Sequence, residues 1–175
     1  IKLSFFDLPE VSSLLETVPD TGIFRRSRDF YTGFNALPDS PDLKIRGLNA
    51  ELRPYQQNGV KWLKYLYDNN FGGCLADDMG LGKTVQAISL LLLATAGRKK
   101  GRKPSMVVMP RTLLFNWKAE FSKFAPGMKI YTYYGPDRDL TEASGNDVIL
   151  TTYALIRNDI EIFSNMKFNC LILDE

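Results

Sequence analysis

The sequence predicts an α/β fold in which a mostly parallel sheet is flanked by helices. Short apolar stretches typical of buried strands, such as residues 105–109 and 147–153, alternate with longer stretches of helical periodicity. Strands that alternate with helices in this way form parallel sheets. A glycine turn at residues 80–82 joins an apolar stretch to a helical one. We therefore expect one α/β lobe over residues 49–175, preceded by a small irregular accessory segment over residues 1–48.

The composition is that of an ordinary globular protein. The 175 residues are 45% hydrophobic and 24% charged, and a net charge of +2 gives no overall signature of nucleic-acid binding. The longest apolar run, residues 88–96, is far shorter than the roughly 20 residues of a membrane span, and no signal peptide opens the chain. Histidine is absent, so we expect no zinc site. Cys74 and Cys170 are interpreted as small core residues in a reducing compartment.

The first 48 residues are punctuated by prolines, and between them no helical pattern lasts more than about ten residues. Residues 8–18 are the candidate for one short helix. Residues 24–31 interleave arginines with aromatic side chains, a pattern that suits a nucleic-acid surface. The alternative interpretation, which we favour, is a packed segment with solvated arginines.

The lobe is expected to begin with a helix that opens at residues 52–57 and ends at Asn69 and Asn70. Pro54 falls in its first turn, where a missing N–H costs nothing. Apolar side chains at Val60 and Leu63 mark its buried stripe.

Residues 74–84 then predict a strand, a glycine turn and a helix, which is the context of a phosphate-binding loop. Backbone N–H groups of such a turn face an anion that the helix dipole also favours. Gly80 and Gly82 let the backbone approach phosphate oxygens closely. Lys83 would neutralise the β- and γ-phosphates, and the Thr84 hydroxyl would coordinate Mg²⁺.

The general pattern Gly-x-x-x-x-Gly-Lys-Thr is broken at one position of this loop. Asp77 stands where the pattern asks for glycine, and Asp78 follows it. Two carboxylates beside a triphosphate would repel it unless they turn away to cap the loop or pair with a cation.

Lysines and arginines crowd residues 98–103, between the loop helix and the next strand. We interpret them as a solvated, mobile loop, because a loop entering a parallel strand lies at the sheet edge opposite to bound ligands. An auxiliary phosphate contact is the alternative. The strand at 105–109 is followed by a helix at 113–124, in which Trp117 shares the apolar face and is expected in the core rather than stacked on DNA.

Three further strands are predicted at residues 129–134, 147–153 and 168–175. The last is apolar and ends in an acidic pair. In an ATPase with a phosphate-binding loop, such a pair divides the work: Asp174 holds Mg²⁺ through its water shell, and Glu175 orients the attacking water.

Taken together, these motifs resemble a known family. Residues 76–84, with an acidic pair before Met-Gly-Leu-Gly-Lys-Thr, resemble the first motif of the Swi/Snf-like ATPases, the chromatin-remodeller branch of the helicase-related, DNA-translocating ATPases. The resemblance covers residues 52–175 and joins five motifs in family order. It implies a first RecA-like lobe that is incomplete at its C-terminus, because the family's acidic motif continues with Gly-His and a second RecA-like lobe completes the site.

The resemblance also implies roles for individual residues. Leu-x-x-Tyr-Gln resembles the family's adenine-recognition motif, and a primary amide such as that of Gln56 can donate to N7 while accepting from the N6 amine; a plain surface glutamine is the alternative. The expected nucleotide-binding residues are Gln56, Asp78, Met79, Gly80, Leu81, Gly82, Lys83 and Thr84. The expected catalytic residues are Lys83, Asp174 and Glu175, with Thr84 and Asp174 at the metal.

The expected DNA contacts lie in two strand-to-helix turns. They are Arg111 and Thr112, in a segment that resembles motif Ia, and Thr151 and Thr152, in one that resembles motif Ib. Hydroxyls at the carboxyl end of a strand can bond a phosphodiester without reading sequence. Capping of the following helix is the alternative use of the two later threonines.

The function that the resemblance implies is translocation on double-stranded DNA, driven by ATP and Mg²⁺, which remodels protein–DNA complexes. Such a protein would be intracellular, in a bacterial cytoplasm (nucleoid) or a eukaryotic nucleus. Without the arginines of a second lobe, we expect this stretch alone to bind nucleotide weakly and hydrolyse it poorly. A nucleotide- or DNA-binding module without turnover is the alternative hypothesis, and a GTPase is disfavoured because no Asn-Lys-x-Asp motif is present.

Overall fold

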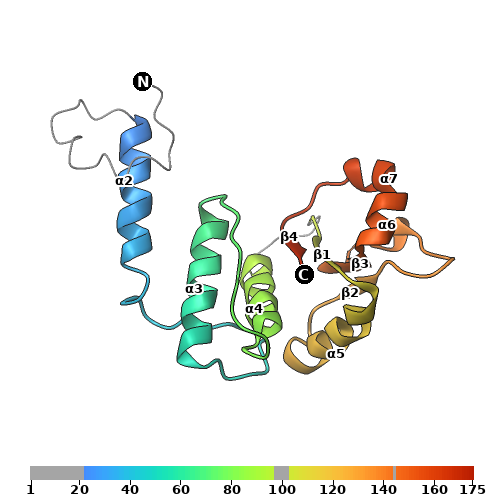
Figure 1. The fold of residues 1–175 in the computed structure, drawn as a ribbon, viewed down its shortest axis with the longest axis horizontal. Coiled ribbons are helices and arrows are strands. Elements are labelled where there is room, and N and C mark those ends of the chain that lie inside the picture. Colours follow the sequence, from blue (N-terminus) through green and yellow to red (C-terminus); the bar gives the residue numbers. More distant parts are fainter. Residues whose placement is uncertain (1–21, 97–102, 144) are drawn as a thin grey trace.

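The computed structural model describes residues 22–96, 103–143 and 145–175 (Figure 1). The expected helix at 8–18 and all but Lys103 of the basic run at 98–103 lie outside the described residues. Within the described ranges, no helix is long and apolar enough to cross a membrane.

Four parallel strands form the central sheet, in the order β2-β3-β1-β4. Their bounds are β1 (Ser105–Met109), β2 (Ile130–Thr132), β3 (Val148–Thr152) and β4 (Leu171–Leu173). Val107 of β1 stands opposite Leu150 of β3 on one side and Ile172 of β4 on the other. Every residue of β1 and β3 is buried, as expected for parallel strands covered on both faces. The predicted α/β fold with a parallel sheet is confirmed, although β2 and β4 are shorter than expected.

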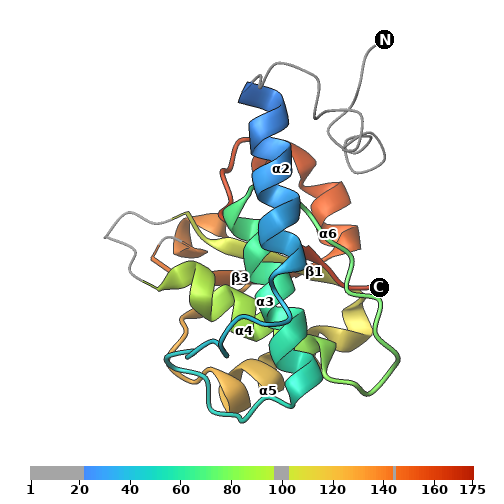
Figure 2. The ribbon, with the colours of Figure 1, turned by 90° about the vertical axis from the view of Figure 1, so that its left-hand side faces the viewer.

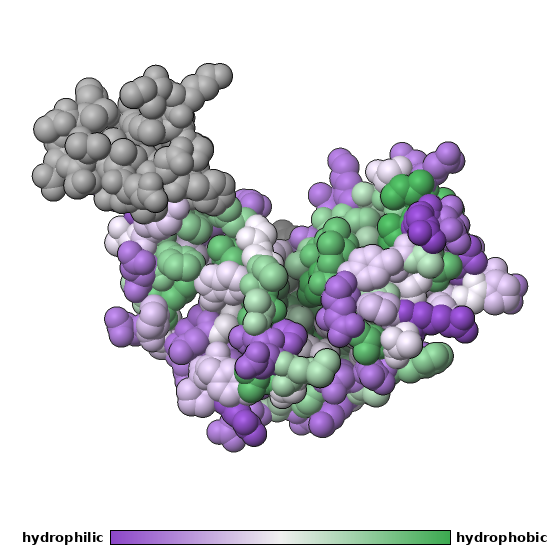
Figure 3. Space-filling model, in the orientation of Figure 1, coloured by the Kyte–Doolittle hydropathy of each residue, from purple (hydrophilic) through white to green (hydrophobic). Residues whose placement is uncertain are grey.

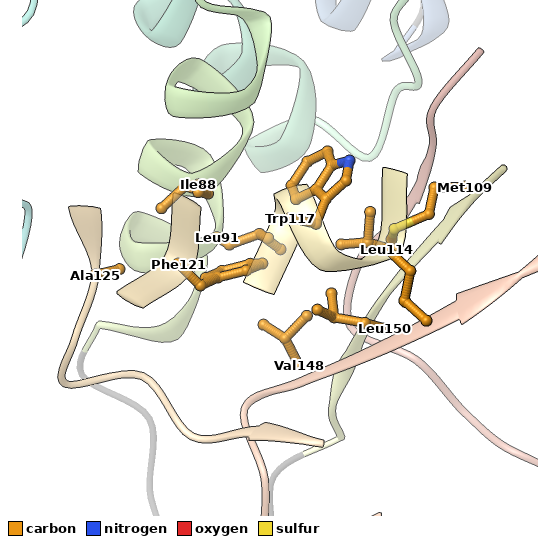
Figure 4. Close-up of a cluster of buried hydrophobic side chains, with 10 residues drawn as sticks. Ile88, Leu91, Met109, Leu114, Trp117, Phe121, Ala125, Val148 and Leu150 are labelled. Atoms are coloured by element: carbon orange, nitrogen blue, oxygen red, sulfur yellow. The ribbon is translucent and has the colours of Figure 1, made fainter. Parts of the chain in front are cut away.

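Helices cover both faces of this sheet. On one face lie α4 (Lys83–Thr95) and α5 (Leu114–Phe124), and α3 (Pro54–Asp68) packs against α4. Figure 4 shows the resulting cluster, in which Leu91 of α4 and Phe121 of α5 meet Leu150 of the sheet. On the other face, α6 (Tyr153–Asn158) and α7 (Ile160–Ser164) cover a second cluster. Short 3-10 turns occupy Arg111–Leu113 and Leu140–Ala143.

The accessory segment contains a helix that the sequence analysis did not predict, α2 (Gly22–Asn35). Figures 1 and 2 show α2 beside α3. Phe30 packs its ring on Tyr65 and Phe71, with centroids 5.3 and 4.8 Å apart. The helix was missed because its apolar partners lie more than 30 residues away, and this packing agrees with the interpretation as a packed segment.

A buried lysine fastens the connection between α2 and α3. Lys61 is 5% exposed, and its Nζ donates to the carbonyl oxygen of Ser40 at 2.6 Å and pairs with Asp42 at 3.0 Å. Breaking such a pair would leave a buried charge without a partner, so the contact holds the connecting segment in place.

The strand predicted before the glycine turn does not form. Residues 71–82, all of them described, carry neither helix nor strand, and Cys74 is exposed rather than in the core, while Cys170 is half-buried. A parallel strand needs a neighbour for its backbone hydrogen bonds. Leu75 of this segment and Leu171 of the edge strand β4 instead line the same cavity. Figure 3 shows the surface hollowed there.

Candidate functional site

The glycine turn has the backbone conformation that its sequence predicts. Gly80 and Gly82 have φ angles of 86° and 78°, in the left-handed region that disfavours other residues. A Cβ on Gly82 would lie 2.6 Å from Nε2 of Gln56. Gly82 is also the N-cap of α4 and carries no side chain to cap it. The first N–H groups of α4 therefore start directly at the loop, as a phosphate site requires.

The two aspartates of the loop differ in their surroundings. The Asp77 carboxylate accepts a hydrogen bond from Nε2 of Gln86 at 3.0 Å, and Gln86 is fully buried in α4. The Asp77 carboxylate is therefore held against α4 by Gln86. Asp78 is exposed. Gln86 was not singled out from the sequence, and its place one turn after Lys83 is the signal that could have found it.

Lys83 holds the loop from inside. Its Nζ donates to the backbone carbonyls of Asp77 at 2.7 Å and Asp78 at 3.1 Å. Met79, by contrast, is 91% exposed. The ammonium group thus contacts neutral carbonyl oxygens, which phosphate oxygens could replace with stronger, charge-assisted bonds.

Gln56 joins α3 to the loop. Its Nε2 donates to the carbonyl of Leu81 at 3.0 Å, and its Oε1 accepts from the backbone N–H of Arg53 at 3.0 Å. The Tyr55 hydroxyl donates to the same Leu81 carbonyl at 3.2 Å. Gln56 is therefore bound to the loop and is not a plain surface glutamine; its contact with adenine stays a prediction.

The acidic pair follows β4 and is held by three neighbouring elements. The backbone N–H of Asp174 donates to the carbonyl of Val108 in β1 at 2.9 Å. Its carboxylate accepts from the indole Nε1–H of Trp117 in α5 at 2.7 Å. The Tyr153 hydroxyl, at the start of α6, donates to the carbonyls of Asp174 at 3.0 Å and Glu175 at 3.1 Å. Sequence reasoning placed Trp117 correctly in the core, at 3% exposed, but missed both contacts.

Tyr153 remains a donor at neutral pH. Burial, together with the negative charges of Asp174 and Glu175, raises the pKa of its hydroxyl above the ordinary value near 10. The proton that bridges to the backbone of the acidic pair is therefore retained throughout the physiological range.

One cavity of about 1210 Å³ brings the loop and the acidic pair together. Lys83 and Thr84 line it from the start of α4, and Asp174 and Glu175 line it from the end of β4. The remaining lining is largely apolar and includes the exposed side chains of Leu171 and Leu173. The structure thus brings Lys83 and Thr84 together with the acidic pair, whereas the other predicted nucleotide-binding residues (Gln56, Asp78, Met79, Gly80, Leu81 and Gly82) are not among the residues that line this cavity.

The oxygen donors at this site fit Mg²⁺. Within the ranges that the structure describes, no group of three or more His, Cys, Asp or Glu side chains could hold a metal alone. Magnesium in phosphate chemistry is held by one or two carboxylates together with phosphate oxygens and water. The hydroxyl of Thr84 and the carboxylate of Asp174, which line the same cavity, are such donors.

The predicted DNA-contact residues lie at the ends of two adjacent strands, since Met109 pairs with Thr152. Arg111 and Thr112 are exposed, and the Arg111 guanidinium lies 5.7 Å from the ring centroid of Tyr134.

Thr151 and Thr152 are buried. The Thr152 hydroxyl oxygen accepts from the N–H of Leu155 at 3.4 Å and caps α6, so the capping alternative is confirmed for it. Among the described residues the Thr151 hydroxyl finds no partner. A DNA contact by any of the four stays a prediction.

Comparisons with known proteins identify relatives of this arrangement. A family model described as the SNF2-related domain matches residues 55–175. Helicase SWR1 of Candida albicans is 44% identical over 136 residues, which cover 73% of this chain and 8% of that protein. The putative ATP-dependent helicase/translocase YwqA of Bacillus subtilis is 37% identical over 177 aligned positions, which cover 95% of this chain and 19% of that protein.

A solved structure gives the same result. The SWI2/SNF2 ATPase core of Sulfolobus solfataricus in complex with dsDNA matches with a TM-score of 0.70 and 37% identity, covering 78% of this chain and 28% of that one. The chain therefore spans less than a third of the length of these relatives.

Proposed function

Because the chain belongs to the SNF2-related family, we propose that it is the ATP-binding part of a DNA-dependent ATPase, which translocates on double-stranded DNA to remodel protein–DNA complexes. One observation carries the proposal: Lys83 and Thr84 of the loop share a cavity with Asp174 and Glu175. The names of the relatives support it, since they include an ATP-dependent helicase/translocase and an ATPase core in complex with dsDNA.

In this proposal the loop binds the phosphates of ATP. Lys83 exchanges its two backbone carbonyl partners for β- and γ-phosphate oxygens, while the first N–H groups of α4 donate to the same phosphates. Asp78, Met79, Gly80, Leu81 and Gly82 form the surrounding backbone. Gln56, which already reaches the Leu81 carbonyl, turns its amide toward adenine.

The acidic pair acts on the reacting end of the nucleotide. Asp174 and Thr84 would hold Mg²⁺, whose charge would neutralise the transferring phosphoryl group. Glu175 orients the attacking water by accepting one of its protons in a hydrogen bond.

The double-stranded DNA is proposed to lie across the carboxyl ends of β1 and β3. Arg111 and Thr112 are exposed there and can bond phosphodiesters directly. The buried hydroxyls of Thr151 and Thr152 would reach DNA only after the start of α6 moves, so we rank them below the first pair.

We further propose that this lobe works inside a larger motor. A second RecA-like lobe would supply arginines across the cleft, a contribution worth about 10³–10⁵ in rate in other enzymes of this chemistry. Residues 1–48 would brace the lobe 49–175, as the contacts of α2 with α3 suggest. The 175 residues alone would hydrolyse ATP poorly.

The test is ATP hydrolysis by the full-length protein with and without double-stranded DNA. We expect stimulation by duplex DNA, abolished by Lys83→Ala, while Lys44→Ala, at an exposed position before α3, stays at the wild-type rate. Hydrolysis that duplex DNA leaves unchanged would refute the motor. Gln56→Ala should weaken ATP binding more than GTP binding, and equal affinity of the wild type for both nucleotides would count against the adenine assignment.

A further inference from the structure

Trp117 connects the packed core to the acidic pair. Its indole is 3% exposed, and its ring lies 5.9 Å from that of Phe121. Yet its one polar atom leaves the core and donates to Oδ2 of Asp174 at 2.7 Å. Figure 4 shows the indole nitrogen directed away from Phe121 and Leu150. The core therefore fixes the direction in which the N–H points.

The bond determines how the Asp174 carboxylate is presented. The backbone of Asp174 is held by its N–H bond to the carbonyl of Val108, and the bond from the indole holds the orientation of the carboxylate. One carboxylate oxygen is engaged by a short, charge-assisted bond, so Oδ1 is the oxygen left for a cation. A buried tryptophan is well suited to this task, because its donor cannot rotate away as a hydroxyl can.

We propose that Trp117 is a positioning residue for the metal-binding carboxylate of Asp174. The proposal rests on the proposed function, since it takes Asp174 as the carboxylate that holds Mg²⁺. Partners that orient a ligating carboxylate typically change metal affinity by about 10–100-fold when removed. Trp117 thus acts through Asp174 and touches neither nucleotide nor metal.

The experiment measures Mg²⁺ dependence of nucleotide binding, without turnover. The full-length protein is titrated with a fluorescent, non-hydrolysable ATP analogue at increasing Mg²⁺ concentrations. Trp117→Phe keeps an aromatic ring and removes the N–H; a benzothienylalanine at position 117, which replaces the N–H by sulfur in the same bicyclic shape, separates the bond from packing. Trp62→Phe is the control, because it removes the other indole, on α3, which does not line the cavity that holds Asp174.

We expect both changes at position 117 to raise the Mg²⁺ concentration for half-maximal binding about 10-fold, with metal-free nucleotide affinity unchanged. Trp62→Phe should behave as wild type. If the sulfur isostere behaves as wild type, the proposal is overturned, whatever the phenylalanine variant does. Equal losses with and without Mg²⁺ would overturn it too, because they indicate packing alone. Failure of the wild type to bind the analogue would instead refute the proposed function.

Discussion

The centre of the sheet and the glycine turn are held by different forces. In β1 and β3, every residue is buried, and a parallel ladder joins each strand to its neighbours. Residues 71–82 have no ladder, and side-chain hydrogen bonds from Tyr55, Gln56, Lys83 and Gln86 hold them instead. The difference suggests a division of labour: the sheet supplies stability, while the loop keeps contacts weak enough for a ligand to replace.

The largest effect is expected where the sheet is fully packed. Leu150→Ala removes a side chain with no exposed surface between α4, α5 and β1, and should lower the free energy of unfolding by about 3 kcal/mol through lost burial and a new cavity. Leu171→Ala is the matched control, because Leu171 is 52% exposed and should cost less than about 1 kcal/mol. Urea denaturation of both variants checks the pair. Equal losses would show that the sheet edge is as tightly packed as its centre.

A smaller effect is expected where α3 touches the helix behind the loop. A Cβ on Gly59 would overlap Oε1 of Gln86, whose amide holds Asp77. Gly59→Ala should therefore destabilise the protein by about 1–2 kcal/mol, even though alanine favours helix by about 1 kcal/mol.

Gly72→Ala provides the control for this change, because a Cβ there meets nothing within 4 Å. Its free energy of unfolding should stay within about 0.5 kcal/mol of wild type. Thermal unfolding compares the two, and a Gly59→Ala variant as stable as wild type would mean that Gln86 can leave Asp77 at no cost.

The smallest effect on stability is expected at a third region, the ion pair between Arg138 and Asp159. Arg138 Nε donates to Oδ2 of Asp159 at 2.9 Å, and the Tyr133 hydroxyl donates to the same oxygen at 2.9 Å. These bonds, that of Arg138 first, lower the pKa of the Asp159 carboxyl. A lowered folded-state pKa contributes stability that is present above the unfolded value near 3.9 and is lost as the pH falls through the folded value.

Asp159→Asn should therefore remove part of the acid sensitivity of the protein. We expect the stability difference between wild type and variant to be largest near neutral pH and to shrink below a pH of about 4. Denaturant unfolding at several pH values measures this difference. The reference is Asp137→Asn, at an exposed position beside Arg138. A difference that stays constant with pH would exclude this network as its source.

The centre of the sheet and the glycine turn also differ in how well the sequence predicted them. β1 was predicted residue for residue, because Ser105 is followed by four apolar residues in a row, a short run typical of a buried strand. The strand before the glycine turn was predicted on the apolar residues 74–76, yet it did not form, because a strand exists only beside a neighbouring strand and a sequence pattern carries no information on neighbours. The apolar face of α2 was missed for the same reason: its partner Tyr65 lies in another helix.

The site divides in the same way. Four of the residues that line the cavity, Lys83, Thr84, Asp174 and Glu175, were predicted as site residues because they stand in local motifs. The bond from Trp117 to Asp174 spans 57 positions and depends on how α5 lies on the sheet, which no local pattern encodes.

The open edge of β4 has a consequence for handling the protein. Leu171 and Leu173 are 52% and 63% exposed, and in the described sheet β4 has a neighbour on one side only. An apolar strand with unpaired backbone groups is a template on which another chain can add a strand. Produced as these 175 residues, the polypeptide is expected to self-associate through this edge, and Leu171→Lys should keep it dispersed by placing a charge where two edges would meet.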